Sequence, residues 1–252
     1  MPAIIAIAAY PLALLASFRQ STGLASKFII EELLSRCAAS TTACWYLLRG
    51  SELSVVDHTV SGYLPTLVQL TQAPSQFQKT AAQLVTQAYR LKGIVALHQN
   101  NVKASETCCQ RALHYSEISE DPSSIVSAII SLASKSYYGK DPKRAEGVYQ
   151  KALAYIGKIP PLLHSRLYVE LAVVYAQQGQ EHEALHFLEL AQKTYPDQPE
   201  NDPSALYAEF TPASMILEEG LTHLALAQYY PQGMANVLGK PLLALSNFKH
   251  RE

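Results

Sequence analysis

The stretch from Leu167 to Pro196 restricts the fold of this chain more than any other. It reads LYVELAVVYAQQGQEHEALHFLELAQKTYP, with an apolar-periodic run on each side of a polar turn. In both runs the apolar residues recur every three or four positions, which is the period of an amphipathic α-helix. Gly179 lies in the turn and Pro196 follows the second run, and both residue types commonly end helices. The stretch therefore predicts two antiparallel helices joined by a short turn.

Small residues mark the places where these helices can approach closely. Ala172 lies in the first predicted helix and Ala184 in the second, while Ala191 would let a further helix approach. With the turn at Gly179, this arrangement matches the tetratricopeptide pattern, in which stacked helix pairs bury a continuous core. The residues that we expect to pack within the repeats are Ala133, Ala145, Ala152, Ala172, Gly179, Ala184 and Ala191.

Similar units occur on either side of this stretch. Ala112, Ala152 and Ala191 occupy corresponding places, at a spacing longer than the standard repeat of about 34 residues. A weaker unit covers about 34–72, where Pro65 should kink or shorten the second helix. A further helix, of the kind that comes first in each pair, is expected over 214–230. The proline-rich connection that leads to it is the best candidate for a mobile loop.

These units predict an all-α fold, a tetratricopeptide-like right-handed superhelix of antiparallel helix pairs. We expect the repeat array over residues 33–228, after an apolar N-terminal segment (1–32) that forms a linker or short helix. Residues 229–252 are expected to form an atypical C-terminal tail. The apolar run within residues 1–18 is short for a membrane span and lacks the positive start of a signal peptide. A packed helix is therefore favoured over a targeting segment or anchor, and a membrane partner is not expected.

Charge and cysteine content limit the function. The chain has 20 Lys and Arg residues against 21 Asp and Glu residues, a net charge of −1, and no run of Lys and Arg exceeds two residues. We therefore expect no direct binding of nucleic acid by this chain. The four cysteines form no CxxC pair, which favours buried thiols in a reducing compartment and a cytoplasmic location. The adjacent pair Cys108 and Cys109 could be a redox or a metal-binding pair, but neighbouring helical residues point in different directions.

No catalytic motif is present. The sequence lacks GxSxG, HExxH, GxxxxGK[ST] and GxGxxG. His182 and His186 have a spacing that could bind a metal on a helix, but exposed positions on a hairpin are the favoured interpretation. We therefore expect no catalytic residue, no cofactor, no metal and no enzyme activity.

A tetratricopeptide array offers a concave groove that is lined by the first helix of each pair. The groove-facing positions hold apolar and aromatic residues and two arginines, which suits a peptide with apolar anchors and a carboxylate. Ordinary surface or packing roles remain the alternative for each position. The candidate groove residues are Arg90, Ile94, His98, Ser134, Tyr137, Tyr138, Arg166, Glu170 and Gln177.

Several segments resemble a known family. CAASTTACWYLLRGSELSVVDHTVSGYLPTL, YRLKGIVALHQNN, LAVVYAQQGQEHEAL, YPDQPENDPS and MILEEGLTHLALAQYYPQG resemble the C-terminal tetratricopeptide region of bacterial Cro/repressor-type (xenobiotic-response-element family) helix-turn-helix transcriptional regulators. The resemblance covers roughly residues 5–232 and does not include a DNA-binding domain. It implies a protein- or peptide-binding scaffold, the sensor or interaction part of a regulator-like protein. The alternative is a structural or oligomerisation part without a ligand of its own, which includes self-association.

Overall fold

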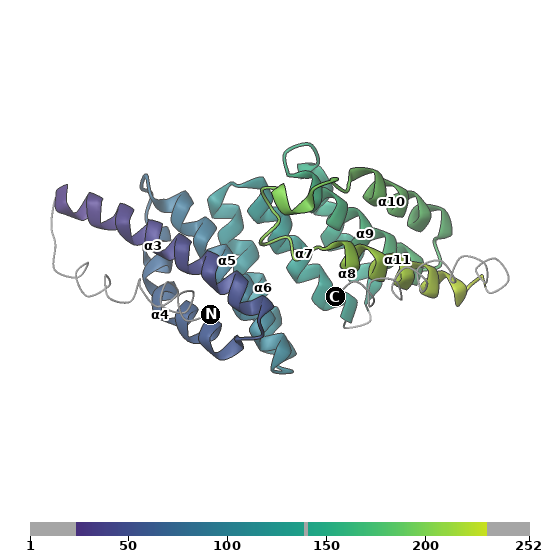
Figure 1. Ribbon diagram of the computed structural model, residues 1–252, viewed down its shortest axis with the longest axis horizontal. Helices are drawn as coiled ribbons and strands as arrows, with labels where there is room; N and C mark the ends of the chain where they lie inside the picture. The colour runs from purple at the N-terminus through teal and green to yellow at the C-terminus, as the bar shows by residue number, and fades with distance from the viewer. Residues whose placement is uncertain (1–23, 139–140, 231–252) are drawn as a thin grey trace. The chain divides into compact units, whose positions relative to one another are not determined.

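The computed structural model describes residues 24–138 and 141–230, and every regular element in these ranges is helical (Figure 1). The predicted all-α class is therefore confirmed for the described residues. The chain divides into two compact units, Met1–Ala128 and Ile129–Glu252, which we describe separately. The predictions for residues 1–18 and for most of the C-terminal tail lie outside the described residues. Within the described ranges, no helix combines the length and hydropathy needed to cross a bilayer.

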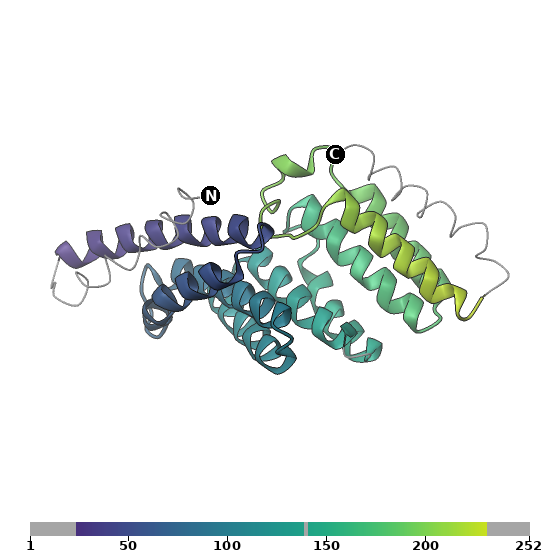
Figure 2. The same ribbon diagram turned by 60° about the horizontal axis from the view of Figure 1, so that its bottom comes forward.

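The first unit is built from helices that pack side by side (Figure 2). α5 packs against both α4 and α6, and α3 contacts α4 and α5. The helical region begins at Leu24, before the predicted boundary at residue 33. α4 continues through Pro65, so of the two predicted effects of this proline, a kink or a shorter helix, the shortening does not occur. The described elements are α3 (Leu24–Arg49), α4 (Leu53–Thr71), α5 (Gln78–His98), α6 (Val102–Ser119) and the first part of α7 (Pro122–Tyr138).

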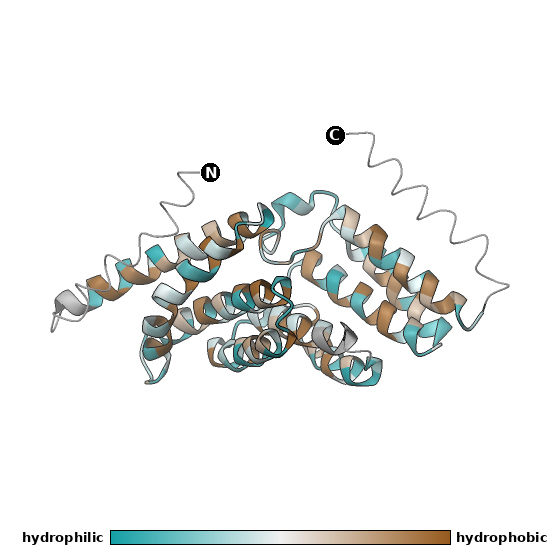
Figure 3. Ribbon diagram, turned by 90° about the horizontal axis from the view of Figure 1, so that it is seen from below, coloured by the Kyte–Doolittle hydropathy of each residue, from teal (hydrophilic) through white to brown (hydrophobic). Residues whose placement is uncertain are grey.

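The second unit is organised around α9 (Pro161–Gln177), which packs against α8, α10 and α11. Because α9 is apolar on nearly all sides, it can be buried from several directions at once. Both hydrophobic and hydrophilic stretches occur along the helices of this unit (Figure 3). The other elements are the end of α7, α8 (Pro142–Ala152), η1 (Leu153–Tyr155), α10 (Glu181–Thr194), η2 (Pro199–Asn201) and α11 (Pro212–Ala227).

Three turns of one type join α3 to α4, α5 to α6 and α9 to α10. In each turn a residue in the left-handed region follows the first helix: Ser51, Asn100 and Gly179, with φ of 63°, 59° and 71°. The next N–H donates to the carbonyl five residues earlier, which satisfies an acceptor at the helix end. The three bonds are Glu52 N to Leu47 O (3.0 Å), Asn101 N to Ala96 O (2.8 Å) and Gln180 N to Tyr175 O (3.0 Å). This recurrence agrees with the predicted helix pairs.

Six of the seven small residues assigned to repeat packing are buried, whereas Gly179 in the turn is half-buried. The six alanines that were predicted to pack, namely Ala133, Ala145, Ala152, Ala172, Ala184 and Ala191, have no exposed surface. Gly93, one residue of the earlier unit, shows why small side chains are needed where two helices meet. A Cβ at Gly93 would lie 3.3 Å from the Sγ of Cys109 on α6, so the helices could not approach as closely.

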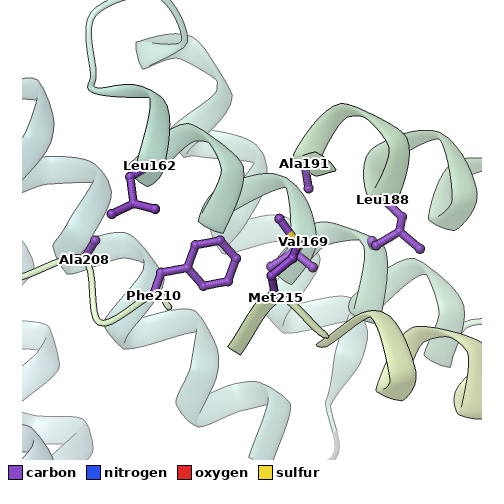
Figure 4. Packing of buried hydrophobic residues seen from close by; sticks show 8 residues of the cluster. Leu162, Val169, Leu188, Ala191, Ala208, Phe210 and Met215 are labelled. Carbon is purple, nitrogen blue, oxygen red and sulfur yellow. The ribbon is translucent and has the colours of Figure 1, made fainter. Parts of the chain in front are cut away.

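The connection between α10 and α11 also belongs to the core (Figure 4). Phe210 and Ala208 from this connection pack with Leu162 and Val169 of α9 and with Met215 of α11. Because Ala208 is fully buried and Phe210 is 5% exposed, the part of the connection next to α11 packs into the core, although its prolines led us to predict a mobile loop.

Candidate functional site

The groove prediction placed Arg90 of α5 on a binding surface, but the structure buries this residue. Its side chain is only 1% exposed. The Cζ atom lies 5.1 Å from the centroid of the Trp45 ring on α3, a cation–π geometry. Nη1 donates to Oε1 of Gln87 at 3.0 Å. Arg90 is therefore part of the core of the first unit, whereas Ile94 is half-buried and His98 is exposed on the same helix.

Arg166 on α9 contacts its own chain. Its Nε lies 3.6 Å from Oε1 of Glu170 and its Nη1 lies 3.7 Å from Oε2 of Glu209. Nη1 also donates to the carbonyl of Ala208. The arginine was predicted to hold the carboxylate or carbonyl of a partner peptide, and here both groups come from the connection that leads to α11. Its side chain is 14% exposed, so little of it is left for a ligand.

Tyr149 on α8 extends this polar cluster. Its hydroxyl donates to Oε2 of Glu170 at 2.7 Å and lies 3.4 Å from the Oγ of Ser134. Burial raises the pKa of Tyr149 well above its usual range, and the nearby Glu170 raises it further, so the hydroxyl remains a donor. The structure thus brings together Ser134, Arg166 and Glu170 from the predicted set. Gln177 is half-buried on α9, and the side chains of Tyr137 and Tyr138 lie outside the described residues.

Glu218 on α11 adds a third carboxyl group near the single guanidinium. Burial raises the pKa of Glu218 to about 7, Glu170 raises it as well, and Arg166 lowers it. Burial lowers the pKa of Arg166, but Glu209 and Glu170 outweigh this effect and leave that pKa above its usual value. The cluster therefore has an excess of acidic groups, and it holds α9 and the connection together.

The connection is fixed to α9 at a second point. Oδ2 of Asp202 accepts a hydrogen bond from the Leu162 N–H at the start of α9, at 3.0 Å. Within the first anchor, Glu209 has a left-handed φ of 51°, which costs a non-glycine residue about 1–2 kcal/mol. The Arg166 contacts offset this strain. The sequence analysis missed Asp202 and Glu209. The mostly apolar run SALYA between them was a signal that this part of the connection packs against a helix.

An exposed uncharged strip on α11 was also missed. Leu217 and Leu224 lie seven residues apart on one side of the helix and are 50% and 53% exposed. The opposite side of α11 is buried through Met215, Thr222 and Leu226. The strip, named the α11 strip below, consists of Ala213, Leu217, Gly220, Leu221, Leu224 and Gln228. Its signal in the sequence was the recurrence of uncharged residues every three or four positions on the outer side.

Two tyrosines follow α11 and dock on the turn between α9 and α10. The hydroxyl of Tyr229 donates to the carbonyl of Gln177 at 2.9 Å, and that of Tyr230 donates to the carbonyl of Gly179 at 3.1 Å. These bonds fix the C-terminal end of α11 beside a neighbouring helix pair. The α11 strip is therefore presented on a helix that is anchored at both ends, by the polar cluster and by the tyrosines.

The described residues contain no group of three or more His, Cys, Asp or Glu that could hold a metal ion. His182 and His186 are both exposed on α10. Burial raises the pKa of Cys37 and of Cys44 to about 12, which keeps both thiols protonated at neutral pH. These two thiols are therefore poor nucleophiles.

No protein-family model matches the chain, and neither a curated protein nor a solved structure is significantly similar to it. The tetratricopeptide assignment and the resemblance to transcriptional regulators therefore remain predictions from the sequence.

Proposed function

We propose that this chain is a non-catalytic, protein-binding helical repeat scaffold in the cytoplasm. In this proposal it is the interaction or sensor part of a bacterial transcriptional-regulator-like protein. The observation that carries the proposal is the α11 strip, where two leucines about half exposed lie one above the other on an anchored helix. The recurring turns and the family-like segments of the sequence support the repeat and regulator parts of the proposal.

The strip supports binding because α11 is apolar on two sides. Its inner side packs on α9, and its outer side presents Leu217 and Leu224 without a charged residue between them in the strip. Single exposed leucines are common on monomeric proteins, but contiguous apolar strips mark interaction sites more often. A helix with apolar residues on both sides normally lies between two packing partners. A second helix is therefore the kind of element that the strip fits.

The polar cluster on α9 supports the alternative, a structural part without a ligand of its own. Arg166 is held by Glu170, Glu209 and the Ala208 carbonyl, so its groups already have partners. For this reason we assign the interaction surface to α11 and not to the predicted groove on α9. The alternative would hold for the whole chain if the α11 strip also proved to have no partner.

Site-specific photocrosslinking in cells of the native host tests the proposal. A photoreactive benzoylphenylalanine replaces Leu224 in the full chain, and a matched variant carries it at Leu185, an exposed leucine among charged residues of α10. We expect a protein adduct from position 224 and little or none from position 185. Equal labelling at both positions, or none at 224, would contradict a binding role for the strip. The mass of the adduct identifies the partner.

The proposal also predicts that the isolated chain does not select DNA sequences. The net charge is −1, and any affinity for duplex DNA would have to come from clustered basic residues. Filter binding at physiological ionic strength, with salt varied, measures this. Salt-sensitive and sequence-selective retention of a duplex would contradict the proposal that this chain is only the interaction part.

A further inference from the structure

We propose that the α11 strip binds the α11 strip of a second copy of this chain, with the two helices antiparallel about a two-fold axis. This inference rests on the proposed function, because it names the partner of the same surface.

Four of the six strip residues alternate between small and large side chains along the helix. Ala213, Leu217, Gly220 and Leu224 follow one another at spacings of four, three and four residues. When a second α11 runs antiparallel about an axis between residues 218 and 219, Leu217 lies opposite Gly220 and Leu224 lies opposite Ala213. Each leucine then faces a small residue of the other copy, which lets the helices approach and interdigitate. The sequence of the strip is therefore complementary to itself in reverse.

The charge of the strip also favours a second copy. In a two-fold contact, both sides of the interface are the same surface, so a charge in the strip would face a like charge. None of the six strip residues is ionisable. Glu218, next to the strip, interacts with Arg166 and Glu170 of its own chain. A strip made for a basic or an acidic peptide would carry charges of the opposite sign, and this one does not.

The size of the strip sets the strength of the contact. A single helix face lies at the small end of protein interfaces, so a weak dimer with a strong dependence on concentration is expected. Leu217 and Leu224 would supply most of the binding energy, because they are the large exposed side chains of the strip.

Sedimentation equilibrium of the full chain from about 5 to about 200 μM tests the inference, since a weak dimer dissociates in this range. We expect a monomer–dimer equilibrium in which Leu217→Asp and Leu224→Asp each weaken association about tenfold or more. Leu185→Asp on α10 is the matched control and should leave the equilibrium within about twofold of the unchanged chain. Circular dichroism verifies that each variant is folded, and Leu224→Gln replaces Leu224→Asp if the aspartate variant is not.

A monomer at all these concentrations would overturn the inference, as would a dimer that is insensitive to Leu217→Asp and Leu224→Asp. The proposed function fails separately. If the photocrosslinked adduct at position 224 contains another protein and the chain is monomeric, the scaffold role stands and the second-copy partner is wrong. If the chain is monomeric and no adduct forms, both are wrong.

Discussion

α5 in the first unit and α9 in the second are each the first helix of a pair, and each carries a largely buried arginine. The partners of these two arginines differ. The equivalent turns at Asn100 and Gly179 align the two helices, with 79 residues between equivalent positions. In this alignment Arg90 corresponds to Val169, and Gln87 corresponds to Arg166. In α5 the arginine lies against an indole ring and an amide, whereas in α9 it lies between two carboxylates.

The two arginines occupy different positions of their helix pairs, since Arg90 aligns with Val169 and Arg166 aligns with Gln87. The repeat pattern predicted that both would line a groove, but both are largely buried against their own chain. The segment that packs against the helix then decides their role. In the first unit α3 supplies the Trp45 ring, and in the second unit the connection supplies Glu209 and the Ala208 carbonyl. Neither arginine is left as a surface group for a ligand.

Removing Arg90 should have the largest effect. Arg90 is the largest fully buried side chain, so Arg90→Ala should lower the free energy of unfolding by about 4 kcal/mol through lost packing and a cavity. Urea denaturation measures the loss. Arg90→Met is the control, because it fills most of the volume without charge and should recover more than half of the loss. A loss of less than about 1 kcal/mol for Arg90→Ala would contradict the buried role.

Removing Arg166 should have the next largest effect. Arg166→Ala leaves Glu170 and Glu209 without their shared cation, and we expect a loss of about 3 kcal/mol in the free energy of unfolding. The double variant Arg166→Ala/Glu209→Gln removes one of the stranded charges and should recover part of that loss. Unchanged stability, together with weakened binding of a partner, would instead restore the predicted groove role of Arg166.

These two arginines also show how far the sequence can predict the structure. The helix pairs, their turns and the buried alanines follow from local periodicity, so Ala172, Ala184 and Ala191 could be assigned from spacing alone. The roles of Arg90 and Arg166 depend on Trp45 and Glu209, which lie more than forty residues away along the chain. No local pattern predicts which distant segment will cover a given helix face.

The excess of carboxyl groups in the second unit predicts a pH dependence. The pKa of Glu218 is about 7 in the folded chain against 4.5 ordinarily, so the folded chain binds this proton more tightly than the unfolded chain. The stability linked to this proton is therefore fully present below pH 4.5 and is lost as the pH rises through 7. Glu218→Gln should raise the free energy of unfolding by about 3 kcal/mol at pH 8 and change it little at pH 4.

Chemical denaturation of Glu218→Gln and the unchanged chain, compared at both pH values, measures this effect. A gain that is equal at pH 4 and pH 8 would mean that Glu218→Gln acts through packing and not through the proton.

The smallest expected effect concerns the equivalent turn positions Asn100 and Gly179. Both have left-handed φ, which asparagine tolerates nearly as well as glycine, so backbone conformation alone does not require a glycine at 179. Tyr229 provides the difference, because a Cβ at Gly179 would lie 3.0 Å from its Cδ1 atom. Gly179→Asn should therefore lower the free energy of unfolding by about 1 kcal/mol, while Asn100→Gly should change it by less than about 0.5 kcal/mol.

In the double variant Gly179→Asn/Tyr229→Ala the cost of the asparagine should largely disappear. Thermal melts of the unchanged chain, of Gly179→Asn, of Tyr229→Ala and of the double variant measure this loss as a coupling energy. If the cost persists without the tyrosine ring, the backbone and not the docking of Tyr229 explains why the two turns differ in sequence.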